Sequence, residues 1–209
     1  MMEHILVLNI IVRRNRMEDI IMENIIYKEI PLEELDEYGN IPFYYKTSKK
    51  YELKKINNGL GGIIFELTDV EEFYKDFGSK VTHWKDTFDL SNWKFFVAYN
   101  EIGKMIAGCV VATKTNNCNM LEKRNDLAVL WDIRVMDEYK NKGIGQKLFD
   151  LAKTYAQENG FNQLKVECQN TNPAAVNFYH KQGMKLCAIN EYAYPEYPNE
   201  TQLLWYLDL

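Results

Sequence analysis

A buried strand, a glycine-containing turn and an amphipathic helix follow one another in this chain, and this unit constrains the fold most. Residues Leu127 to Val135 are apolar and rich in β-branched side chains, as a buried strand requires. Residues Gly143 to Glu158 show the helical period, with one apolar face formed by Ile144, Leu148, Leu151, Ala152 and Tyr155. A further strand is expected from Leu164 to Cys168. Strand, helix and strand in this order predict a parallel strand pair joined by a crossover helix.

The segments on either side of this unit predict a mixed sheet. Residues Lys94 to Tyr99 and Lys104 to Thr113 are strand-like and joined by a short turn, so we expect a hairpin. A second helix is expected from Asn172 to Gln182, because it begins with an asparagine cap and a proline in the first turn. Two strands then end the chain, near Lys185 to Tyr192 and Gln202 to Leu207. The expected fold class is α/β, in its mixed α+β form.

The first ninety residues carry weaker signals. A strand is expected from Asn24 to Ile30, and Pro31 opens a short helix that ends near Tyr38. Between residues 40 and 90 the pattern is irregular, and the clearest prediction there is a helix capped by Asp69 and ending at Phe77.

The extreme N-terminus does not have the order of a secretory signal. The apolar run Ile5 to Val12 is too short to span a bilayer, and the basic cluster of Arg13, Arg14 and Arg16 follows it instead of preceding it. We expect residues 1–22 to be an N-terminal extension or a mis-set start, and residues 23–209 to form a single domain. With no other long apolar segment in the chain, the expected location is cytoplasmic.

The turn before the long helix has the chemistry of a phosphate site. Gly143 and Gly145 let the backbone approach a ligand, and the first amides of the helix have no partner inside it. Together with the helix dipole and with Lys140 and Lys142, these amides favour an anion such as a pyrophosphate. The turn is neither a Walker P-loop nor a G-x-G-x-x-G motif, since Leu148 stands in the place of the third glycine.

Two motifs resemble those of the GNAT N-acetyltransferase family. Lys140 to Gly145 is similar to R/Q-x-x-G-x-G/A, with Lys140 in the first position, and Asn172 to Met184 is similar to N-x-x-A-x-x-F-Y-x-x-x-G-F, with Met184 in the last. The resemblance covers about residues 94–192. Within the family it is greatest to streptothricin acetyltransferases and related small-amine acetyltransferases, on the stretches Trp131–Val135, Val166–Asn172 and Leu204–Leu207. An acid commonly precedes the aspartate of the first stretch in those enzymes, whereas Trp131 occupies that position here.

The resemblance implies a GNAT fold, in which a central mixed and mostly antiparallel sheet is splayed at a parallel strand pair and flanked by helices. It also implies that acetyl-CoA is the co-substrate, bound by a core of about residues 94–192. The cofactor-binding residues that it implies are Ile133, Arg134, Val135, Lys140, Asn141, Lys142, Gly143, Ile144, Gly145, Gln146, Asn172, Ala175 and Tyr179.

The catalytic candidates follow from the chemistry of amine acetylation, which needs a neutral amine and a protonated leaving thiolate. The resemblance implies that Tyr179 is the general acid. Asp132 and Glu167, on neighbouring strands, are the candidate bases. Strand alternation places Asp132 on one face with Leu130 and Arg134, and gives each acid a nearby cation in sequence. Either acid is then a base, a holder of a cationic substrate, or a structural charge.

Two aromatic runs with acids between or beside them suit a cationic amine. The runs and their acids are Tyr38, Phe43, Tyr44 and Tyr45, then Tyr192, Tyr194 and Tyr197 with Glu191 and Glu196. The alternative is that these rings serve packing. The first expectation for the acceptor is a primary amine of a small cationic molecule, such as streptothricin or a polyamine. The alternatives are a protein or peptide N-acetyltransferase and a non-catalytic acyl-CoA-binding module.

Composition excludes several other classes. The net charge of −5 disfavours a general nucleic-acid binder, which needs an excess of Lys and Arg. The four cysteines form no C-x-x-C pair and the three histidines are scattered, so no metal site is expected and the thiols are expected to be reduced. We expect no nucleic-acid or membrane partner, and the sequence leaves homodimer formation open.

Overall fold

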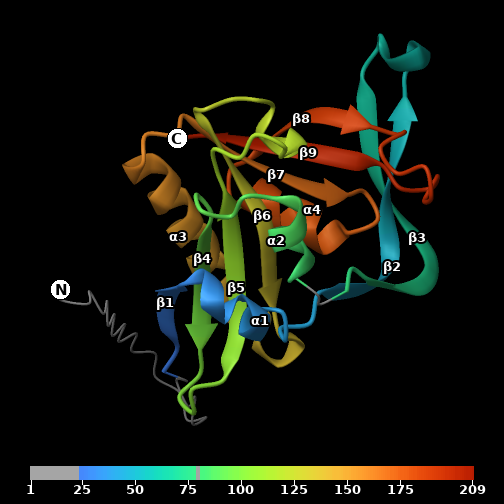
Figure 1. Cartoon of the computed structure of the whole chain (residues 1–209). Helices are drawn as coiled ribbons and strands as arrows, with labels where there is room; N and C mark the ends of the chain where they lie inside the picture. The colour runs from blue at the N-terminus through green and yellow to red at the C-terminus, as the bar shows by residue number, and fades with distance from the viewer. Residues whose placement is uncertain (1–23, 79–80) are drawn as a thin grey trace, which may run out of the picture.

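A seven-stranded mixed sheet forms the centre of the molecule (Figure 1). The computed structural model describes residues 24–78 and 81–209, so the expected extension 1–22 lies outside the described residues. The strand order is β1-β4-β5-β6-β7-β9-β8, and every neighbouring pair is antiparallel except β6 and β7. The strands are β1 (Ile26–Ile30), β4 (Lys94–Tyr99), β5 (Met105–Ala112), β6 (Leu127–Val135), β7 (Gln163–Gln169), β8 (Lys185–Asn190) and β9 (Gln202–Asp208). The mixed sheet with one parallel pair is the predicted architecture.

Helices cover both faces of this sheet (Figure 1). One apolar core joins the sheet to α3 (Ile144–Glu158) and α4 (Pro173–Lys181), and a second core joins its other face to α1 (Leu35–Tyr38) and α2 (His83–Thr87). The helices predicted from Gly143 and Asn172 are confirmed. Short 3-10 turns connect the elements at Leu32–Glu34, Asn57–Gly59, Asn119–Leu121 and Asp137–Tyr139. Both faces of the sheet are therefore packed in apolar cores.

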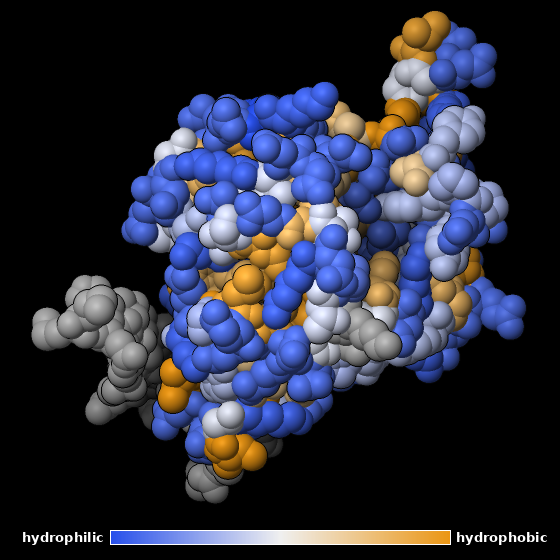
Figure 2. All heavy atoms as spheres, in the orientation of Figure 1, coloured by the Kyte–Doolittle hydropathy of each residue, from blue (hydrophilic) through white to orange (hydrophobic). Residues whose placement is uncertain are grey.

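A long hairpin, β2 (Tyr44–Lys55) and β3 (Ile63–Asp76), forms a separate two-stranded sheet. It extends beyond the rest of the domain, and Figure 2 shows apolar residues at its tip, where Leu60 is 90% exposed. The helix predicted from Asp69 to Phe77 is wrong, because this segment belongs to β3. The apolar residues of this segment have helical spacing. The segment nevertheless pairs with β2, and its cross-strand contacts include the ion pairs Lys46–Glu72 and Lys49–Asp69.

The parallel strands β6 and β7 separate shortly after they begin. They pair only over Leu127–Val129 and Gln163–Lys165, and no pairing continues beyond these residues. From Leu130 onward β6 still pairs with β5, and β7 pairs with β9 over its whole length. The carboxyl-terminal halves of β6 and β7 thus border an opening in the sheet, which is the place where α/β sheets bind ligands.

Candidate active site

The turn into α3 is shaped for an anion. Gly143 caps the helix with a φ of 82°, a conformation that favours glycine, and no side chain caps the helix there. The first hydrogen bond into the helix runs from the Lys147 amide to the Gly143 carbonyl, at 3.0 Å. The amides of Ile144, Gly145 and Gln146 therefore precede the first repeat of intrahelical hydrogen bonds. They have no partner inside the helix and can donate to phosphate oxygens, so their role in cofactor binding stays a prediction.

Two lysines bring positive charge to this turn, and both have contacts of their own. The Lys140 ammonium lies 2.5 Å from a carboxylate oxygen of Asp137. The Lys142 ammonium lies 4.9 Å from the centre of the Tyr139 ring. The Lys140 ammonium and the Tyr44 hydroxyl, which both bond to Asp137, hold the pKa of this carboxyl below its ordinary value. Asp137 stays ionised at neutral pH and attenuates the charge that Lys140 offers to an anion.

The exposed edge of β6 presents backbone groups to the opening. The Met136 amide donates to the Ile106 carbonyl of the neighbouring chain segment, so alternation directs the backbone groups of Arg134 toward β5 as well. The amides and carbonyls of Ile133 and Val135 then point toward the opening. Backbone donors of this kind suit the amide groups of a pantetheine arm or a developing oxyanion.

Asp132 lies in a buried ion pair. Its carboxylate receives hydrogen bonds from Arg134 Nε at 2.9 Å, from a second Arg134 nitrogen, and from the Tyr38 hydroxyl at 2.6 Å. Arg134 also donates to the Ile41 carbonyl at 3.0 Å. Burial, followed by the charge of Asp132, raises the pKa of Tyr38 well above its ordinary value. Both carboxylate oxygens of Asp132 thus have donors, and the guanidinium of Arg134 neutralises its charge.

One expectation about Asp132 is wrong. It does not share a face with Leu130, because the register between β5 and β6 shifts between Val110 and Val111. This bulge inserts one extra residue, Trp131, so Leu130 packs with α3 and α4 whereas Asp132 faces α1. The expected shared face of Asp132 and Arg134 is confirmed. Arg134 therefore directs its side chain to Asp132 and its backbone to β5, so neither faces the opening, in contrast to its expected role in cofactor binding.

Glu167 has a different environment from Asp132. It is half-buried on β7, two residues after the last residue that pairs with β6. Its carboxylate accepts hydrogen bonds from the Tyr194 hydroxyl at 2.5 Å and from the Gln202 amide at 2.7 Å. Lys165, the cation expected beside it, instead lies 2.8 Å from a carboxylate oxygen of Glu122. Within the described part of the chain, Glu167 has neutral donors and no cationic partner.

Tyr179 lies on α4 against the splayed strands. Burial, with smaller effects from Cys168, Asp132 and Cys109, raises the pKa of Tyr179 above its ordinary value. These three neighbours belong to β7, β6 and β5, so the hydroxyl faces the central strands. Among the described residues it has no hydrogen-bond partner, yet the only fully enclosed side-chain polar atom without a partner is Trp205 Nε1. The hydroxyl of Tyr179 is therefore not completely enclosed, although the residue as a whole is only 5% exposed.

Asn172 is confirmed as the cap of α4. Its side-chain oxygen accepts a hydrogen bond from the Ala175 amide at 3.1 Å, which leaves the amide nitrogen as the group that can contact a ligand. Ala175 is half-buried and packs against the core beside it. Asn172 thus begins the helix that carries Tyr179 seven residues further on.

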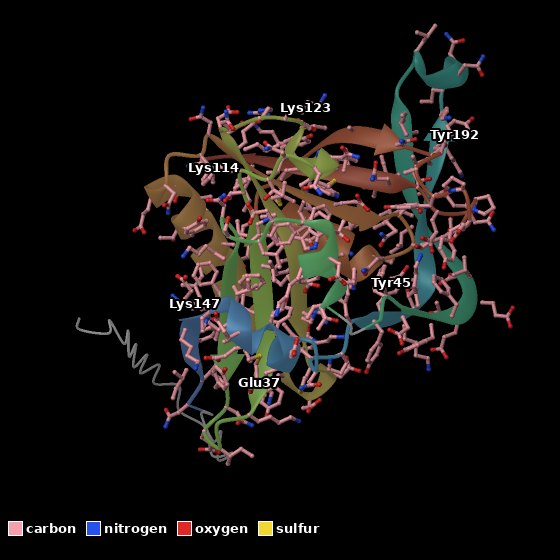
Figure 3. All side chains as sticks on the ribbon, in the orientation of Figure 1. Glu37, Tyr45, Lys114, Lys123, Lys147 and Tyr192 are labelled. Atoms are coloured by element: carbon pink, nitrogen blue, oxygen red, sulfur yellow. The ribbon has the colours of Figure 1, made fainter. Side chains whose placement is uncertain are left out.

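The two aromatic runs are joined by the hairpin and the β8–β9 loop. Lys75 of β3 lies 4.1 Å from the centre of the Tyr197 ring and forms a largely buried ion pair with Glu200. Glu191 is paired with Lys55. Figure 3 shows Tyr45 at the base of the hairpin and Tyr192 beside its outer part, where Tyr192 is 88% exposed. Lys55 and Lys75 of the hairpin thus contact the β8–β9 loop, whereas Tyr38 of the first run lies apart from both, beside Asp132.

Sequence reasoning missed two residues of this site, Gln202 and Asp137, and the contact between Asp137 and Tyr44. Gln202 was expected only as part of the last strand, and Tyr44 and Asp137 were not expected to meet. Each contact joins residues far apart in sequence, and no local pattern signals it. Within residues 24–78 and 81–209, no group of three His, Cys, Asp or Glu side chains is placed to hold a metal ion. No helix in these two ranges is long and apolar enough to cross a membrane.

In this structure a splayed strand pair lies beside a helix N-terminus that no side chain caps. This arrangement is typical of proteins that bind an acyl carrier through its phosphates. Residues 64–184, more than half of the chain, match the model of the acetyltransferase (GNAT) family, and the chain belongs to this family. The match begins within β3, so β1 and the whole of β2 lie outside it.

Relatives with known names are similar to parts or to the whole of the chain. Streptothricin acetyltransferase A of Bacillus subtilis (strain 168) is 34% identical over 97 residues, which are 44% of this chain and 56% of that protein. The chain spans about half the length of the curated relatives it matches. The structure of a nourseothricin acetyltransferase has a TM-score of 0.70 at 21% identity, and covers 88% of this chain and 98% of its own.

A second solved structure has the same TM-score of 0.70, at 23% identity, and covers 88% of this chain and 99% of its own. It is assigned as a streptothricin acetyltransferase of Bacillus anthracis str. Ames and is in complex with acetyl coenzyme A. At these identities the two structures demonstrate a shared fold, and the roles of individual residues in this chain have to be argued from its own geometry.

Proposed function

We propose that this protein transfers an acetyl group from acetyl-CoA to an amine of a small cationic molecule. In this proposal Glu167 binds the substrate ammonium and removes its proton. The observation that carries the proposal is the environment of Glu167, a half-buried carboxylate at the opening with only neutral hydrogen-bond donors. A substrate ammonium supplies the missing cation. Asp132 does not compete for it, because Arg134 already neutralises that carboxylate.

The residues of the opening support each requirement of the reaction. The amides at the start of α3 bind the pyrophosphate of the cofactor, and the backbone of Ile133 and Val135 binds its pantetheine arm. Glu167 removes a proton from the substrate ammonium, directly or through water, and the neutral amine attacks the thioester carbonyl. A backbone amide of β6 stabilises the oxyanion. Tyr179, kept protonated by its raised pKa, donates a proton to the departing thiolate.

A small acceptor fits the hairpin better than a peptide does. A peptide substrate needs an open groove, whereas β3 is tied to the β8–β9 loop by Lys75 and Glu200. A pocket of ≈ 380 Å³ lies between these two segments and is lined by Phe73, Thr171 and Tyr197, among others. Its size suits a small molecule or a single side chain. The names of the relatives make streptothricin the first amine to test.

The test compares amine classes and one isosteric variant. Purified protein with acetyl-CoA is offered streptothricin, spermidine or a peptide with a free N-terminus, and mass spectrometry detects the acetylated product. We expect product from a small cationic amine, and Glu167→Gln to lower kcat/KM by about 10² or more. Gln163→Glu, a change on the same strand outside the opening, is the control and keeps its activity. Acetylation of the peptide alone, or full activity of Glu167→Gln, contradicts the proposal.

We also propose that residues 23–209 form one folded domain and that it acts in the cytoplasm. Burial of Cys109, Cys118 and Cys168 as free thiols supports a reducing compartment. Expression of residues 23–209 alone, followed by the same assay, tests whether the preceding residues are needed.

A further inference from the structure

Asp137 connects the phosphate-binding turn to the hairpin. It lies two residues after β6, and its carboxylate accepts a hydrogen bond from the hydroxyl of Tyr44, the first residue of β2. The same carboxylate lies 2.5 Å from the ammonium of Lys140, and this ammonium lies 5.5 Å from the centre of the Tyr44 ring. One carboxylate therefore holds both a lysine of the turn and the base of the hairpin.

The next residue of β2 is bound to the opposite side of the opening. The hydroxyls of Tyr45 and Thr171 lie 2.8 Å apart, and Thr171 follows β7 and precedes the cap of α4. Neighbouring side chains of a strand point to opposite sides, so one strand contacts both borders. Further along β2, the Tyr51 amide donates to the Asn170 carbonyl at 2.9 Å. Strand β2 thus crosses from the end of β6 to the end of β7.

We propose that Tyr44 and Asp137 are positioning residues that couple occupancy of the phosphate site to the placement of the hairpin. The inference rests on the proposed function. A cofactor phosphate at the turn competes with Asp137 for the ammonium of Lys140. Asp137 then retains the Tyr44 hydroxyl as its donor, and a hydrogen bond to a carboxylate strengthens when no ammonium compensates the charge. Cofactor binding therefore tightens the attachment of β2, which borders the acceptor side of the opening.

The coupling has a second consequence for the cofactor itself. Without ligand, the Asp137 carboxylate pairs with the Lys140 ammonium. With ligand bound, Asp137 lies close to the phosphates as a like charge. Removal of this charge by Asp137→Asn therefore increases the affinity for coenzyme A, by about threefold, which is the size expected of an exposed charge interaction. A merely structural role of Asp137 predicts no gain in affinity.

The experiment measures hydrogen–deuterium exchange of the full chain with and without coenzyme A, together with calorimetric affinity. In the unmodified protein, we expect coenzyme A to slow exchange at residues 44–47 and 72–76. Tyr44→Phe keeps the affinity within about twofold, because it leaves Lys140 in place, but it loses this protection. Asp137→Asn binds coenzyme A more tightly and also loses the protection of the hairpin from exchange. Tyr74→Phe is the matched control, since the Tyr74 ring lies 5.0 Å from that of Tyr44, and it keeps the protection.

The outcomes separate the inference from the proposed function. If coenzyme A does not bind the unmodified protein, both the inference and the proposed function are wrong. Binding without a change in hairpin exchange overturns the coupling alone, as does equal protection in Tyr44→Phe and the unmodified protein. Loss of protection in both Tyr44→Phe and Asp137→Asn, with the gain in affinity confined to Asp137→Asn, supports the coupling.

Discussion

The side chain of Arg134 grips the carboxylate of Asp132, two residues earlier on the same strand, through two of its nitrogens, and both side chains are 2% exposed. Tyr38 completes the cluster from α1. The pair joins the bulged part of β6 to α1 on the face opposite α3. It makes Asp132 a structural residue and leaves Glu167 as the acid available to a substrate.

Replacement of Asp132 by asparagine should therefore lower stability. Asp132→Asn leaves the Arg134 charge buried without its partner, which costs about 3–5 kcal/mol in the free energy of unfolding. Urea denaturation measures this loss. Asp137→Asn removes an exposed paired carboxylate and should cost less than about 1 kcal/mol. A loss of activity in Asp132→Asn without any loss of stability would contradict the structural role.

The two glycines of the turn should respond differently to substitution. Gly143 has a φ of 82°, and Gly143→Val places a branched side chain near the amides that we propose bind the phosphates. We expect its affinity for acetyl-CoA to fall at least about tenfold, since the ligand loses close approach to these donors. In Gly145→Ala the new methyl group meets Phe178 and Val135 at 3.7 and 3.8 Å, which is ordinary contact. This control should keep near-normal affinity in calorimetry, with folding of both variants verified by circular dichroism.

Tyr179 is expected to act through its hydroxyl. Tyr179→Phe should lower kcat by roughly 10²-fold at saturating acetyl-CoA and leave cofactor binding nearly unchanged. Burial raises the pKa of Tyr179, so the group remains protonated as pH rises through its ordinary value near 10. The kcat of the unmodified enzyme should accordingly show no alkaline decline due to Tyr179 up to about pH 10. Near-normal kcat in Tyr179→Phe, combined with damage in Tyr179→Ala, would instead indicate packing.

Gly108 should not tolerate a side chain, because Tyr38 of α1 packs directly against it. A Cβ atom at this position of β5 lies 2.5 Å from Tyr38 Cε2 and 2.9 Å from the Phe96 carbonyl oxygen. Gly108→Ala should displace Tyr38 and lower the free energy of unfolding by about 1–3 kcal/mol. Thermal denaturation compares it with Gly145→Ala, whose added methyl group has room. Equal stability of the two variants would exclude close packing of Tyr38 on Gly108.

The order of elements from Lys94 onward could be predicted because its signals are local. The strand Leu127–Val135 and the helix that ends at Glu158 have the predicted bounds within one residue. The cap at Asn172 and the turn at Gly143 depend on side chains and backbone angles within a few residues. Such features depend on residues that lie close together in the sequence, and the same residues form the family's motifs.

The hairpin and the roles of the acids could not be predicted in this way. Residues 69–77 have helical spacing, yet the cross-strand partners of β3 decide that they form a strand. One inserted residue in β6 reverses the face of Asp132 relative to Leu130.

The sequence by itself determined the family, the glycine turn into α3 and the order of strands and helices around it, because short-range geometry defines all three. The tertiary structure alone decided which of two acids is neutralised and which remains available. Asp132 meets Tyr38 across 94 residues, and Glu167 meets Gln202 across 35. A carboxylate's function depends on the charges and donors that surround it, and in this protein the chain brings them together only when it folds.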